Sequence, residues 1–188
     1  MKRFGFVLIG LLISTVQAEP DSTEGKRLYF ESGGYGCVVC HGLVAEGGGQ
    51  AGGFIRGAAL DTLNSSLAEN EPMKPLASVL TAENRADIIA YLQSLSLIPL
   101  VQLRYENNQW TALAEPLQIG QVAELIAYNA TFETQSLDLT MLGLGIVQLP
   151  ALGSESYRWV AKDSEFDLPT VVTSYVESFA DVALKKTQ

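Results

Sequence analysis

Two cysteines and the only histidine of the chain stand together in the stretch Cys37-Val38-Val39-Cys40-His41. In this C-x-x-C-H order the two thiols can add to the vinyl groups of a porphyrin, and the imidazole directly after them can bind its iron. The other chemistry open to such a pair is a thioredoxin-like dithiol, which needs a cysteine of lowered pKa between a strand and a helix. No βαβ pattern surrounds this motif. The sequence therefore predicts one covalently attached haem c, with Cys37 and Cys40 as the attachment points and His41 as the proximal iron ligand.

The second axial ligand of the iron cannot be another imidazole of the same chain, because His41 is the only histidine. Met73 is the best candidate, since Pro72 and Pro75 fix φ on both sides of it and stiffen an extended loop that can hold a thioether against iron. A methionine that merely fills a core is the alternative, and Lys74 is the nearest substitute ligand. An iron with both axial positions filled has no free site for peroxide or oxygen, which favours electron transfer over catalysis.

Helical patterns on both sides of the motif predict the elements that must position it. Ahead of the motif, Ser22 or Thr23 can cap a first helix in which Gly25 and Tyr29 share one face. A glycine-rich loop and the methionine loop follow the motif. Thr81 can then cap a last helix, whose apolar residues fall at helical spacing: Ile88, Tyr91, Leu92 and Leu95.

In this order of parts, residues 19–98 resemble class I cytochrome c. The resemblance implies an all-α haem domain, a last helix that crosses the first where Gly25 allows an aromatic such as Tyr91 to come close, and a haem edge exposed near the methionine loop. The chain departs from the family in Gly53-Phe54-Ile55-Arg56-Gly57, where Gly53 replaces a proline whose carbonyl commonly accepts the proton of the proximal imidazole. The Gly53 carbonyl can still accept it. Arg56 is a candidate contact for a haem propionate, with an ordinary surface arginine as the alternative.

Beyond residue 98, helical spacing gives way to short alternating or β-rich runs at 101–105, 122–128, 137–141, 157–161 and 179–184. Asn107-Asn108 marks a tight turn. We expect a second domain, residues 99–188, folded as an all-β antiparallel sandwich and packed on the first, because the junction 96–100 is short and apolar. It weakly resembles a cupredoxin without metal ligands, since no cysteine or histidine follows His41 and copper requires them. An immunoglobulin-like sandwich is the alternative.

The first 18 residues read as a cleaved signal peptide. Lys2 and Arg3 precede an apolar run over 4–13, and small residues surround a cleavage point after Ala18. The run is shorter than the roughly 20 residues that span a bilayer, so we expect a periplasmic or secreted protein. With 12 basic and 21 acidic side chains the chain has a formal charge of −9, which argues against nucleic acid and anionic membranes as partners. A redox protein with a basic docking surface is the expected partner, although acidity can also serve solubility alone.

The expected function is that of an exported monohaem c-type cytochrome, not an enzyme, that transfers single electrons between redox proteins. One alternative is a haem subunit docked to a periplasmic oxidoreductase, with the β half as its docking module. Another is a haem-based sensor of small ligands, which requires Met73 to leave the iron. Catalysis by the second half has no support, because no catalytic motif occurs there.

Overall fold

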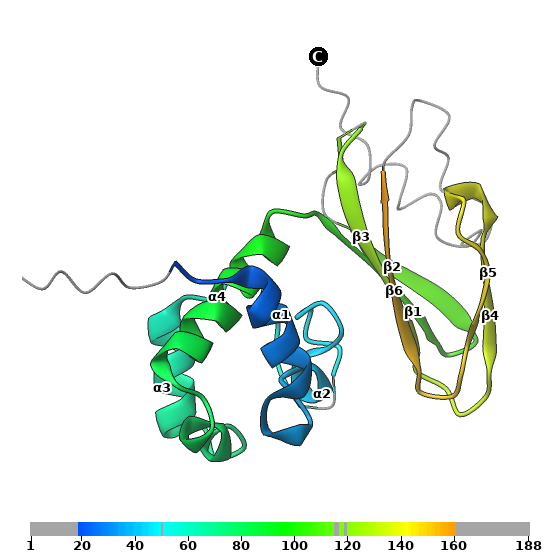
Figure 1. Ribbon diagram of the computed structural model, residues 1–188. Helices are drawn as coiled ribbons and strands as arrows, with labels where there is room; N and C mark the ends of the chain where they lie inside the picture. Colours follow the sequence, from blue (N-terminus) through cyan, green and yellow to red (C-terminus); the bar gives the residue numbers. More distant parts are fainter. Residues whose placement is uncertain (1–18, 50, 115–116, 119, 161–188) are drawn as a thin grey trace, which may run out of the picture.

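The computed structural model of the chain describes residues 19–49, 51–114, 117–118 and 120–160. The predicted signal peptide over 1–18 and the β-rich run at 179–184 lie outside these residues. Helices come first along the chain and strands follow, and the last helix leads directly into the first strand (Figure 1).

In the described part of the first half there are four α-helices: α1 (Ser22–Glu31), α2 (Val38–His41), α3 (Leu60–Glu69) and α4 (Ala82–Ser96). The cap of α1 is Asp21, whose carboxylate accepts the backbone N–H of Thr23 at 2.7 Å. The expected cap at Ser22 or Thr23 is therefore wrong by one or two residues. The Thr81 cap of α4 is confirmed: its hydroxyl accepts the Asn84 N–H, and the Asn84 side chain returns a bond to the Thr81 N–H, both at 3.1 Å.

The crossing of α1 and α4 is close because Gly25 has no side chain. A Cβ at this position would overlap the backbone carbonyl of Asp87. One turn further on, the rings of Tyr29 and Tyr91 pack with centroids 5.4 Å apart. The two helices thus cross as expected, but Gly25 meets the backbone of α4, and the aromatic contact belongs to Tyr29.

Six strands follow. A four-stranded sheet has the order β2-β1-β3-β6, built from β1 (Leu100–Glu106), β2 (Gln109–Ala114), β3 (Val122–Asn129) and β6 (Ser154–Val160). Asn107 and Asn108 turn β1 into β2 with positive φ at both positions, as the sequence predicts for a tight hairpin. The hairpin of β4 (Gln135–Leu139) and β5 (Gly145–Leu149) forms a second, two-stranded sheet.

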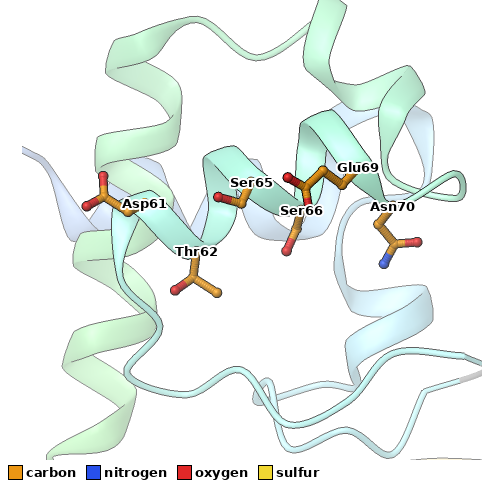
Figure 2. A pocket seen from close by; sticks show the side chains of 6 residues that line it. All are labelled: Asp61, Thr62, Ser65, Ser66, Glu69 and Asn70. Carbon is orange, nitrogen blue, oxygen red and sulfur yellow. The ribbon is translucent and has the colours of Figure 1, made fainter.

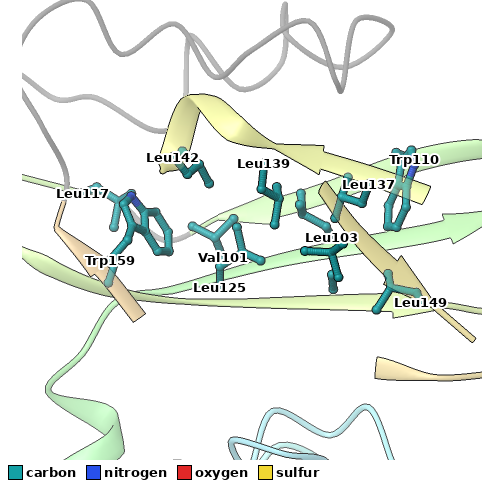
Figure 3. Close-up of a cluster of buried hydrophobic side chains, with 13 residues drawn as sticks. Val101, Leu103, Trp110, Leu117, Leu125, Leu137, Leu139, Leu142, Leu149 and Trp159 are labelled. Carbon is teal, nitrogen blue, oxygen red and sulfur yellow. The ribbon is translucent and has the colours of Figure 1, made fainter. Parts of the chain in front are cut away.

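The two sheets share one apolar core (Figure 3). Strands β4 and β5 place alternate side chains, such as Leu137 and Val147, toward it and leave their neighbours exposed. The buried members of this core are Val101, Leu103, Trp110, Leu117, Ala123, Leu125, Ala127, Leu137, Leu139, Leu142, Val147, Leu149 and Trp159.

The predicted fold class, an all-α cytochrome domain followed by an all-β antiparallel sandwich, is wrong. The described chain is a small mixed α/β protein with four α-helices and two sheets. Strands β1 and β3 pair in parallel, because the β1–β2 hairpin occupies one edge of β1 and the chain returns to the other edge in the same direction. The larger sheet is therefore mixed, and neither the cupredoxin-like nor the immunoglobulin-like sandwich describes it.

The helical and β parts also pack on each other through a small apolar cluster. Strand β3 is buried on both faces: Leu125 faces the core between the sheets, whereas Ile126 and Tyr128 face the helical part. There they pack with Val44, from the loop after the C-x-x-C-H segment, and with Leu100, four residues after the end of α4. No helix among the described residues is both long and apolar enough to cross a membrane.

Candidate haem site

The end of α1 positions the C-x-x-C-H segment. The Tyr29 carbonyl accepts the Cys37 N–H at 2.7 Å, and Gly36, with φ of 66°, turns the chain between α1 and α2 where a Cβ would overlap backbone. The Cys37 carbonyl then accepts the His41 N–H at 2.9 Å within the single turn of α2. This turn fixes the spacing of the two thiols and of the imidazole.

The four predicted site residues Cys37, Cys40, His41 and Met73 line one cavity. The volume of this cavity is about 170 Å3, and the cavity is partly open to solvent. The remaining lining residues are small or apolar apart from one asparagine: Gly36, Ala51, Gly52, Gly53, Asn70, Pro72 and Leu76.

The His41 ring is held by a backbone carbonyl. Its Nδ1 lies 2.9 Å from the Gly53 oxygen, so a proton on Nδ1 is donated to this carbonyl and Nε2 is left to bind a metal. Gly52 closes the loop by donating its N–H to the Cys40 carbonyl at 2.7 Å. A Cβ on Gly52 would come within 2.5 Å of His41 Nδ1. The Gly53 carbonyl thus stands where an acceptor for the His41 proton is expected.

Met73 reaches the same cavity from a turn. Its backbone has φ −94° and ψ −22°, so the expected extended loop is wrong at this residue. The Asn70 carbonyl accepts the Met73 N–H at 2.8 Å, and Pro75 is the second residue of the 3-10 helix η2 (Lys74–Ser78). The prolines still stiffen the segment, but in a helical turn. The Lys74 ammonium forms an ion pair with the Glu71 carboxylate at 2.5 Å, and Lys74 does not line the cavity.

These donors fit a haem c better than a dithiol or a bare ion. Burial raises the pKa of the Cys37 thiol to about 11, whereas a redox-active dithiol needs a lowered value. Within the described part of the chain, no three His, Cys, Asp or Glu side chains gather as ligands of one ion. A covalently attached iron porphyrin uses two thiols at the edge of its ring, together with an imidazole and a thioether. Side chains of all three kinds line this cavity.

Arg56 lies away from this cavity. It is only 7 % exposed and donates to the carbonyls of Val44 at 3.3 Å and of Leu95 and Ile98 at 2.5 Å each. Its guanidinium thus ties the loop after the haem motif to the junction between α4 and β1. The position is not that of a surface arginine, and a contact with a haem propionate stays a prediction.

Two supporting residues were not assigned a role from the sequence. The Tyr29 hydroxyl donates to the Gly42 carbonyl at 2.6 Å, directly after His41. Glu46 is 5 % exposed and its carboxylate accepts the Val44 N–H at 2.8 Å, while burial raises the pKa of this carboxyl. The helical pattern already placed Tyr29 beside Gly25, but no signal distinguishes Glu46 from a surface acid in a polar loop.

A more open hollow runs along the outer face of α3 (Figure 2). Its six lining residues are polar and follow helical spacing: Asp61, Thr62, Ser65, Ser66, Glu69 and Asn70. The two carboxylates are eight residues apart, about 12 Å along a helix that rises 1.5 Å per residue, too far to share one ion. We interpret this face as solvated helix surface.

Comparison of the chain with protein-family models, with curated proteins and with solved structures finds no match.

Proposed function

We propose that the chain is an exported, monohaem c-type cytochrome that transfers single electrons between redox proteins. One observation carries the proposal: Cys37, Cys40, His41 and Met73 line the same cavity, with His41 Nδ1 held by the Gly53 carbonyl. The resemblance of residues 19–98 to class I cytochrome c supports it independently of the fold class.

In this function the haem supplies an iron that gains and loses one electron. Cys37 and Cys40 would anchor the ring through thioethers, and the turn of α2 sets the spacing of the two thiols. The carbonyl of Gly53 holds the His41 proton on Nδ1 and orients Nε2. Met73 would offer its thioether to the iron from a proline-stiffened turn. With His41 and Met73 both holding the iron, the haem group would supply one-electron transfer rather than binding of exogenous ligands.

The experiment is an optical spectrum of the oxidised protein, matured in a host that attaches haem c. We expect a covalent haem by mass and a weak far-red band from iron–sulfur ligation, lost in Met73→Ala. Leu76→Ala is the matched control, since Leu76 is also half-buried in the cavity wall and carries no sulfur. A band that survives in Met73→Ala, or that Leu76→Ala also removes, contradicts Met73 as the ligand. A protein that attaches no haem contradicts the function itself.

A further inference from the structure

A second cavity lies where the helical part meets the larger sheet. Its volume is about 270 Å3 and it is partly open to solvent, which puts it just below the roughly 300–1,000 Å3 of pockets that take drug-sized ligands. Helices α1 and α4 line it on one side, and strands β3 and β6 line it on the other. None of its lining residues lines the haem cavity, so it is a separate site that suits a small ligand.

Two cations line this cavity, one from each part of the protein. Lys26 lies on α1, and Arg158 lies on β6. Among the basic residues in the described part of the chain, Lys26 is the only one whose side chain makes neither an ion pair nor a hydrogen bond. The chain as a whole has a formal charge of −9. A lysine without an acidic partner therefore sets this place apart from the rest of the described surface.

Arg158 uses only part of its guanidinium within the protein. Its Nε donates to Oε2 of Glu124, its neighbour across the sheet on β3, at 2.7 Å. Its two terminal amino groups make no hydrogen bond to the described residues, and the side chain is about half exposed. Glu124 also lines the cavity and is 4 % exposed. Two cations and one carboxylate thus leave the cavity with a single net positive charge.

The hydroxyl of Tyr91 is a buried donor without a partner. Tyr91 lines the cavity from α4, is 5 % exposed and packs its ring on Tyr29, but its hydroxyl makes no hydrogen bond to the described residues. Burial raises the pKa of this hydroxyl to about 12, so it keeps its proton at neutral pH and can donate it in a hydrogen bond. A buried hydroxyl without a partner costs free energy. An acceptor atom of a ligand in the cavity would remove that cost.

The rest of the wall is part polar and part apolar. Ser156 lies two residues before Arg158 on the same face of β6 and adds a further hydroxyl. Phe30 lies one turn of α1 beyond Lys26, and Leu43 and Val44 come from the loop after the C-x-x-C-H segment. A ligand that matches this wall has one negatively charged end and one apolar end.

We propose that this cavity binds a small organic carboxylate with a single negative charge. The carboxylate accepts hydrogen bonds from Lys26 and from the terminal amino groups of Arg158, because a guanidinium presents N–H groups that match carboxylate oxygens. The Tyr91 hydroxyl donates to the same end, and the apolar end lies against Phe30. A phosphate dianion fits less well, because it would leave a negative charge beside the buried Glu124. The site goes beyond the proposed electron transfer and does not depend on it.

The test is an NMR titration of the full, haem-loaded chain labelled with 15N, with benzoate as the probe. Benzamide has the shape of benzoate without its charge, and inorganic phosphate has charge without an apolar part. Lys26→Gln and Tyr91→Phe each remove one donor, and Tyr91→Phe keeps the ring against Tyr29. Arg27→Gln is the matched control, because Arg27 is the neighbouring cation on α1, about half exposed, and does not line the cavity.

We expect benzoate to shift the backbone amides of Ser156 and Arg158 to saturation, and to bind about tenfold or more tightly than benzamide or phosphate. Lys26→Gln and Tyr91→Phe should each weaken benzoate binding, Lys26→Gln by about tenfold, as loss of a hydrogen bond to a charged group does. Arg27→Gln should leave the affinity unchanged. The melting temperatures of Lys26→Gln and Tyr91→Phe without ligand should match that of the natural chain, because neither side-chain group that is removed has a partner.

Three results would overturn the proposal. Equal weakening by Lys26→Gln and Arg27→Gln would show that benzoate follows the general charge of α1 and not this cavity. Phosphate or benzamide that binds as tightly as benzoate would refute a carboxylate as the ligand class. Tighter benzoate binding after Asp163→Asn together with Glu165→Gln would assign the two cations to acids of the chain itself.

Discussion

Replacing Arg56 by methionine tests whether this residue is a structural tie or a haem contact. The side chain is 7 % exposed and donates to the carbonyls of Val44, Leu95 and Ile98. Methionine keeps much of the volume and removes every donor. Burial raises the pKa of Glu46, and the substitution also removes a positive charge that partly offsets this rise.

The expected loss follows from these contacts. A buried acceptor left without a partner costs about 1–3 kcal/mol, and Leu95 keeps a second donor, the Ile98 N–H at 3.0 Å. The carbonyls of Val44 and Ile98 both lose this donor, and at about 1–3 kcal/mol each the expected destabilisation is about 2–6 kcal/mol. At roughly 2–4 °C per kcal/mol for a chain of this size, the melting temperature should fall by about 4–24 °C.

Thermal and urea unfolding of the haem-loaded protein measure this loss. Arg104→Met is the control, because Arg104 is about half exposed and pairs only on the surface with Glu106, a contact worth about 0–1 kcal/mol. Arg56→Lys keeps the charge without the planar fork and should fall between the two. Equal stability of Arg56→Met and Arg104→Met would refute the structural role. A changed reduction potential with unchanged stability would instead favour the propionate contact.

Three further predictions concern the supporting elements. Gly25→Ala should destabilise the protein by about 1–3 kcal/mol through overlap with the Asp87 carbonyl, although the same change in a free helix is favourable by about 1 kcal/mol. A higher urea midpoint for this variant would contradict the close crossing of α1 and α4. Gly52→Ala should disturb the hydrogen bond of the His41 imidazole and raise the midpoint potential, by roughly 59 mV for each tenfold change in the relative affinity of the protein for the two oxidation states of the haem. Gly53→Ala should leave the potential unchanged, because nothing lies within 4 Å of its Cβ. Equal potentials of the two variants in spectroelectrochemistry would count against a role of Gly52 in positioning His41. Burial raises the pKa of Glu46, so the folded state binds this proton more tightly than the unfolded state does. The natural chain should therefore gain stability relative to Glu46→Gln as the pH falls through the raised folded-state pKa toward the unfolded value; a difference in melting temperature that does not vary with pH would refute this.

Local signals in the sequence were strong where one short segment determines the structure. Thr81 and Asn84 form their capping box from four adjacent residues, and the Asn107-Asn108 turn needs only its own backbone. Signals were weak where partners are distant. Helix α3 was not predicted, and neither were β2 and β5, because their short patterns are ambiguous without the surfaces on which they pack.

The sequence of β3 contains a pattern that favours a mixed sheet over an antiparallel sandwich. The run Ala123-Glu124-Leu125-Ile126-Ala127-Tyr128 is almost continuously apolar, which is typical of a strand covered on both faces. Its two cores confirm this burial: Leu125 meets the second sheet and Ile126 meets the haem-motif loop. An antiparallel sandwich with one solvated face would not need such a strand.

The sequence by itself determined the chemistry that this chain can offer: two thiols, one imidazole and few thioethers, because residue type and spacing along three or four positions need no tertiary context. Only the tertiary structure decided where those groups meet. It brought Met73 into the cavity of Cys37, Cys40 and His41, buried Arg56 among carbonyls, and set Lys26 and Arg158 around one cavity. The physical reason is that such contacts join residues far apart in sequence, and packing of the helices against β3 settles them.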